Sequence, residues 1–130
     1  MIVRHTEFTS EVLGFDTTDV DKPFVLKEKV NVYYAKDDIK ADFNIPKKNR
    51  SDGVTIKNKF AQLVICCPHD PRYVPAAIIH DFLVDTKITD RQTASEIFKE
   101  VLIQHGVSQF KAQIMFLAVE FWQKYIRGWK

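Results

Sequence analysis

The strongest constraint on the fold is a pair of sequence runs in which apolar and polar residues alternate. The runs span residues 30–34 and 39–45, on either side of the polar turn Lys36-Asp37-Asp38. A period of two is typical of a strand with one buried face. The sequence therefore predicts an antiparallel β-hairpin over residues 28–46, within a β region at 24–46 that ends at a proline. The side chains expected to face the rest of the protein are Val32, Phe43 and Ile45.

The second half of the chain has apolar residues at helical spacing. Pro75 suits the first turn of a helix over residues 74–84. Thr89 and Gln92 match a capping box at the start of a second helix, and Gly106 suits the cap at its end. A third helix is expected over about 108–127, as the central packing element, with an N-terminal cap at Ser108. Its predicted buried stripe is Phe110, Ile114, Leu117, Ala118, Phe121 and Tyr125.

These patterns predict an α+β fold, with an N-terminal antiparallel hairpin or small sheet packed against about three C-terminal helices over 74–127. The 130 residues include 10 Phe, 4 Tyr and 2 Trp, enough to build one core and hence a single domain over 1–130. Residues 1–22 show little periodicity and are expected to be irregular, or to hold one short strand. Residues 47–60 are expected to form a basic loop.

The sequence contains no apolar run of the roughly 18–20 residues that a membrane-spanning helix requires. Its N-terminus is polar by Arg4, so neither a signal peptide nor a transmembrane segment is expected. Cys66 and Cys67 are adjacent, and neighbouring cysteines rarely meet disulfide geometry. Two free thiols favour a reducing compartment.

Positive charge is concentrated between residues 47 and 59, although the net charge of the whole chain is only +2. One interpretation is a loop that contacts the phosphates of a nucleic acid. A solvated loop is favoured, because no aromatic side chain is interleaved with the cations to stack on bases. The candidate binding residues are Lys47, Lys48, Arg50, Lys57 and Lys59.

The clearest candidate for chemistry is the pair His80-Asp81, which lies within an otherwise apolar helical segment. Burying two such groups without partners costs several kcal/mol, so other polar groups are expected to satisfy them. Asp52 lies in the preceding loop and is expected to reach the same helical turn. His80 could then act as a base or metal ligand, with the two carboxylates around it. A hydrogen-bonded structural cluster is the favoured alternative.

Several stretches resemble a small uncharacterised family of tailed-phage and prophage proteins. Residues 45–56, IPKKNRSDGVTI, are similar to its Val-Pro-x-Gly-Phe-x-Thr-Asp-Gly-Ala-Ser-Ile-Pro loop. Residues 76–83 match its Ala-x-x-x-His-Asp-x-Leu helix, and 91–98 match in part its Arg-x-x-Ala-Asp-x-x-Phe helix. Gly106-Val107 and the aromatic-rich segment 115–122 resemble the end of the family, so the likeness covers about residues 24–129.

The chain departs from the family pattern at three places. Lys48-Asn49 stand where the family has Gly-Phe, and Lys57 stands where it has Pro. Ser95 replaces the acid of the second helix. If that acid contributes to a metal site in the family, this chain lacks one ligand. The resemblance implies a phage or prophage gene product, located in the host cytoplasm or the virion, more firmly than it implies a mechanism.

The favoured hypothesis is a binding or structural factor, such as a virion component or accessory protein, whose partner is a phage or host protein. It predicts an exposed apolar patch, for which Trp122, Tyr125 and Trp129 are candidates, although core packing is favoured for Trp122. The alternative is a phage hydrolase that uses His80, Asp81 and Asp52, with a divalent metal as a conceivable but not favoured cofactor. Nucleic-acid binding through residues 47–59 is the least favoured hypothesis.

Overall fold

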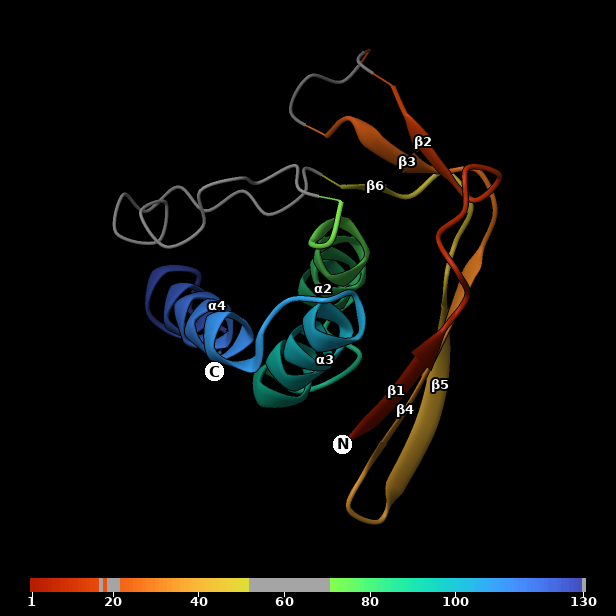
Figure 1. Cartoon of the computed structure of the whole chain (residues 1–130). Coiled ribbons are helices and arrows are strands. Elements are labelled where there is room, and N and C mark those ends of the chain that lie inside the picture. The colour runs from red at the N-terminus through yellow and green to blue at the C-terminus, as the bar shows by residue number, and fades with distance from the viewer. Residues whose placement is uncertain (17, 19–21, 52–70, 130) are drawn as a thin grey trace.

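The computed structural model describes residues 1–16, 18, 22–51 and 71–129 (Figure 1). Its central β-element is the hairpin of β4 (Val30–Lys36) and β5 (Ile39–Ile45). The register runs from Lys36 opposite Ile39 to Val30 opposite Ile45. Asp37 turns the chain with a φ of 55°, a left-handed conformation that aspartate adopts more readily than most residues. The predicted hairpin and its turn are confirmed.

The predicted inward face of the hairpin is also observed. Val32 and Ile45 are fully buried, while Phe43 is half-buried and stacks on Phe82 with 5.8 Å between the ring centroids. The third strand of this sheet is β1 (Ile2–His5). It pairs antiparallel with β4, so the strand order is β1-β4-β5.

A second three-stranded sheet has the order β2-β3-β6. Its strands are β2 (Leu13–Phe15), β3 (Phe24–Leu26) and β6 (Arg50–Ser51), all antiparallel. Two expectations are corrected by this sheet. Residues 1–22 contribute a strand to each sheet, and the segment predicted as a basic loop over 47–60 contains the short strand β6. Strands of two or three residues are too short to show a period, so pairing alone reveals them.

Residues 71–129 contain three α-helices, and these confirm the predicted α+β class. They are α2 (Val74–Thr86), α3 (Arg91–Gln104) and α4 (Gln109–Phe121), and α4 continues as a π-helical turn, η1 (Trp122–Ile126). None of the described helices combines the length and the apolarity needed to cross a lipid bilayer.

The helix ends follow local capping chemistry. Pro75 lies in the first turn of α2, Gly106 has a φ of 92°, and Ser108 accepts a hydrogen bond from the Lys111 amide, all as expected. The predicted capping box of α3 is wrong by one residue. Asp90 is the cap, and its carboxylate accepts a hydrogen bond from the Thr93 amide at 3.1 Å.

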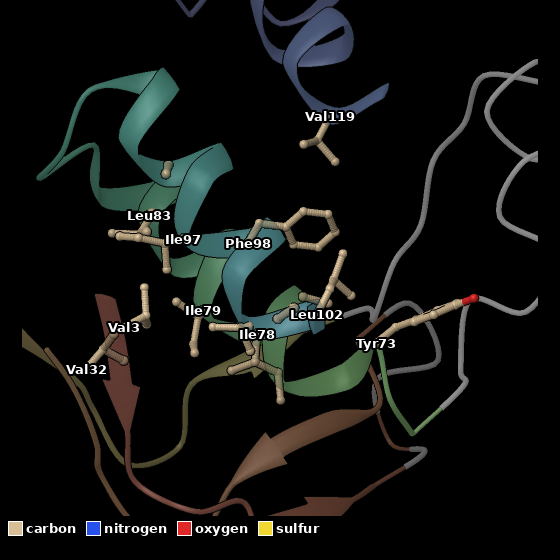
Figure 2. Close-up of a cluster of buried hydrophobic side chains, with 14 of the residues drawn as sticks. Val3, Val32, Tyr73, Ile78, Ile79, Leu83, Ile97, Phe98, Leu102 and Val119 are labelled. Atoms are coloured by element: carbon tan, nitrogen blue, oxygen red, sulfur yellow. The ribbon is translucent and has the colours of Figure 1, made fainter. Parts of the chain in front are cut away.

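The elements form layers, as Figure 1 shows: the β1-β4-β5 sheet lies on one side of α2 and α3, and α4 lies on the other. Figure 2 shows Val3 and Val32 of the sheet facing the side chains of α2 and α3. The central helix is α3, which contacts α2, α4 and β1. Its buried apolar residues are Ala94, Ile97, Phe98, Val101 and Leu102.

The prediction that the last helix is central is therefore wrong. The buried residues of α4 are Ala112, Met115 and Val119. The predicted core residues Phe110, Leu117 and Phe121 are exposed, and Ile114 is only half-buried. Trp129 is buried, and Trp122 is half-buried. Apolar residues occupy both sides of α4, so the helical period does not show which side is buried. The sequence analysis chose the side that is exposed.

This layer order predicts a large difference between two phenylalanine truncations. Phe98→Ala should lower the free energy of unfolding by about 3–5 kcal/mol, because Phe98 is 1% exposed and its removal leaves a cavity. Phe121→Ala should cost less than about 1 kcal/mol, because Phe121 is 51% exposed. Urea unfolding of both variants measures these values, and equal losses would contradict the layer order.

Candidate functional site

His80 lies on the buried side of α2 and is only 5% exposed. Its ring packs against Phe98 of α3, with centroids 5.1 Å apart. Its Nε2 atom is buried and has no hydrogen-bond partner among the residues that the structure describes. Burial disfavours the charged imidazolium and lowers the pKa of His80 from 6.5 to about 4. His80 is therefore neutral at physiological pH.

A neutral, unpartnered imidazole nitrogen is chemically able to accept a proton or bind a metal ion. The low pKa makes His80 a weaker base than free imidazole. A general base is most effective when its pKa lies near the working pH, so the pKa of His80 is poorly suited to that role. The environment of His80 thus fits a buried ligand or a structural residue better than a general base.

The three residues of the predicted cluster, His80, Asp81 and Asp52, differ in what the structure describes of them. Asp81 follows His80 on α2, is half-exposed and makes polar or electrostatic contact with other residues. Successive helical side chains point about 100° apart, so the two residues face different surroundings. Asp52 lies outside the described residues. The convergence of Asp52 on His80 and Asp81 therefore stays a prediction. Among the described residues, no three His, Cys, Asp or Glu side chains form a metal-binding group.

The predicted basic residues have different environments. Lys47 and Lys48 are exposed after β5. The Arg50 side chain is engaged: Nη2 donates to the Asp16 carbonyl at 3.0 Å, and Nε donates to the Lys22 carbonyl at 3.1 Å. Its guanidinium also lies 3.6 Å from the Asp16 carboxylate. Arg50 thus holds the β2–β3 connection.

The other two candidates, Lys57 and Lys59, lie outside the described residues. Because Arg50 is already bound to Asp16 and Lys22, a phosphate would have to displace these contacts in order to bind its guanidinium.

Ser95, where the resemblance described above implies an acid, has a definite structural partner. It is fully buried, and its hydroxyl donates to Glu120 Oε1 on α4 at 2.5 Å. Arg91 Nε donates to both carboxylate oxygens of Glu120 at 3.2 Å, and Arg91 Nη1 donates to the Trp129 carbonyl. This cluster connects α3, α4 and the residues after η1.

The side of α4 that faces away from the core is apolar, although the sequence analysis predicted that these apolar residues would be buried. Five large apolar side chains of α4 and η1 are exposed, and we call them the outer face of α4. They are Phe110 (78% exposed), Leu117 (56%), Phe121 (51%), Tyr125 (64%) and Ile126 (54%).

Helical geometry explains why these residues share a surface. Phe110, Leu117 and Phe121 are seven and four residues apart, so they line one side of a helix with 3.6 residues per turn. Met115 and Val119 lie on the opposite side, against the core. Phe121 also packs against Tyr125, with ring centroids 5.2 Å apart. The outer face is a continuous apolar surface and not a scatter of single side chains.

The fold and these features define a small α+β domain with a buried histidine and an apolar helix surface. A family model described as a protein of unknown function (DUF1353) matches residues 24–119. The chain belongs to this family, whose matched region extends from β3 into α4. No curated protein and no solved structure shows significant similarity to this chain.

The buried state of His80 predicts a loss of stability in acid. The unfolded chain binds a proton at His80 below about pH 6.5, whereas the folded protein does so only near pH 4. The contribution of His80 to stability is therefore complete above pH 6.5 and is lost as the pH falls toward 4. Between pH 7 and pH 4.5 this residue alone should remove about 2 kcal/mol from the free energy of unfolding.

His80→Leu provides the control, because leucine has a similar volume and does not titrate. The variant should lose about 2 kcal/mol less than the wild type over the same pH interval, as measured by urea unfolding at both pH values. Identical pH dependence in the two proteins would show that His80 is not held neutral in the folded state.

Proposed function

We propose that this domain is a phage- or prophage-encoded binding or structural factor, which attaches to a phage or host protein through the outer face of α4. The observation that carries the proposal is the exposure of five large apolar side chains over α4 and η1. A monomeric protein rarely leaves a continuous apolar surface in water unless the surface has a partner.

The chemistry of the outer face supports protein binding in particular. Aromatic side chains are enriched at the energetic centres of protein interfaces, and Phe110, Phe121 and Tyr125 are aromatic. Fully burying a side chain of this size stabilises a complex by about 1.5–3 kcal/mol. The Lys124 ammonium lies 5.2 Å from the Tyr125 ring centroid, so a cation borders the apolar surface. An apolar centre with a charged rim is the usual composition of an interface.

The phage context rests on the resemblance of residues 45–56 and 76–83 to phage and prophage proteins. On this proposal the protein acts in the host cytoplasm or the virion. The arrangement of neighbouring genes tests this part of the proposal, because the gene should lie among phage genes. A gene surrounded by unrelated metabolic genes would contradict it.

The double variant Leu117→Glu/Phe121→Glu tests the binding surface. It should leave the melting temperature nearly unchanged, because both side chains are exposed, and should reduce phage yield. Ile88→Glu is the matched control, since Ile88 is 55% exposed but lies between α2 and α3. It should leave the yield unchanged. Normal phage yield from the stably folded double variant would contradict the proposal.

Light scattering during size-exclusion chromatography identifies the partner class. A monomer at micromolar concentration is expected if the partner is another phage or host protein. A dimer that the double variant dissociates would instead identify a second copy of this chain as the partner, and would overturn the assignment to a different protein.

One observation favours a second candidate function, a hydrolase with His80, Asp81 and Asp52 at its centre. Within the described part of the chain the buried Nε2 of His80 has no hydrogen-bond partner, and a substrate or a divalent metal could supply one. His80→Asn and Asp52→Asn should each abolish hydrolysis if this function holds, while the folded state persists.

Nucleic-acid binding through Lys47 and Lys48 has weaker support, because Arg50 of the same segment is engaged with Asp16.

A further inference from the structure

Two histidines that are far apart in the sequence meet between the sheet and the helices. His5 ends β1, and His105 follows the last residue of α3. Their Nε2 atoms lie 3.2 Å apart, and their ring centroids lie 5.3 Å apart. The neighbouring Gln104 donates to the Val3 carbonyl at 2.6 Å, so the end of α3 is fixed against β1 at this point.

The backbone determines which nitrogen of His5 carries hydrogen. His5 Nδ1 lies 2.6 Å from the Thr6 carbonyl oxygen. A carbonyl oxygen only accepts hydrogen bonds, so Nδ1 is the donor. In neutral His5 the lone pair is therefore on Nε2, which faces His105. Metal-binding histidines have this same arrangement, in which the non-ligating nitrogen donates to a backbone carbonyl.

The separation of the two nitrogens matches that of two ligands on one metal ion. Zinc–nitrogen bonds of 2.0–2.1 Å at a tetrahedral angle place two ligand nitrogens about 3.3 Å apart. The observed separation is 3.2 Å. In the metal-free protein one hydrogen lies between the nitrogens. Once His105 carries its hydrogen on Nδ1, both lone pairs are available to a cation and both rings stay neutral.

We propose that His5 and His105 form a binding site for one divalent transition-metal ion of the zinc, nickel or copper type. Imidazole favours these ions over Mg²⁺ and Ca²⁺, which prefer oxygen ligands. Among the described residues no third His, Cys, Asp or Glu completes the set, so water or a small anion occupies the remaining positions.

The site borders solvent, because His5 and His105 are both only half-buried. Two protein ligands leave the remaining positions of the metal ion to exchangeable water or anions. The site is therefore suited to a metal ion that keeps exchangeable ligands, and not to a closed structural zinc centre.

The experiment must separate this pair from the other cysteines and histidines in the chain, Cys66, Cys67, His69 and His80. We therefore use the full chain with Cys66→Ser, Cys67→Ser, His69→Asn and His80→Leu as the background. Isothermal titration with ZnCl₂ near neutral pH should show one site, and MgCl₂ should show none. Adding His5→Asn or His105→Asn should weaken Zn²⁺ binding at least about tenfold, because each removes one of two ligands.

Zinc binding that is absent from the background protein, or that persists after both histidines are replaced, overturns the proposal. Circular dichroism melts without metal establish that each variant is folded. If the background variant does not fold, imidazole ¹⁵N spectra of the unsubstituted chain provide the test. One equivalent of Zn²⁺ should shift the Nε2 signals of His5 and His105, and unchanged signals would contradict the site.

Discussion

The structure depends on the packing of one helix, α3, between the rest of the core and α4. Five of its apolar residues are 0–1% exposed, and it contacts α2, α4 and β1. This position buries His80 against Phe98 and brings His105 to the end of β1. It also makes α4 an outer layer, so one side of α4 contacts α3 and the opposite side meets solvent (Figure 1). Both surfaces that we propose as functional follow from this arrangement.

How much of the fold the sequence predicts depends on how distinct each local signal is. The alternation at 30–34 and 39–45 has only one buried face, so the hairpin and its register were predictable. The short strands β2 and β3 contain three residues each, and their pairing depends on segments that are distant in the sequence. In α4 the signal is ambiguous, because a helix with apolar residues on two sides gives the same period for either side. In the structure the buried side of α4 is the one with Met115 and Val119.

The candidate site was predictable only in part, for a related reason. A histidine in an apolar helix stands out in the sequence. His80 is indeed buried, and its Nε2 atom has no hydrogen-bond partner in residues 1–16, 18, 22–51 and 71–129. The direction of its pKa shift depends on how completely its neighbours exclude water, and that is a property of the packed structure. The His5–His105 pair has no sequence signal at all, because the two residues are separated by almost the whole chain.

Ser95 is part of a hydrogen-bonded cluster with partners from two helices, α3 and α4. The resemblance to phage proteins implies an acid at this position, whereas here a serine hydroxyl donates to the Glu120 carboxylate. A second carboxylate in the same buried place would repel Glu120, and one of the two would have to take up a proton. The serine instead supplies a donor, and Arg91 supplies the opposite charge. Position 95 in this chain therefore stabilises the contact between α3 and α4. The hydrogen bond leaves the side of α4 that carries Phe110, Leu117 and Phe121 exposed to solvent.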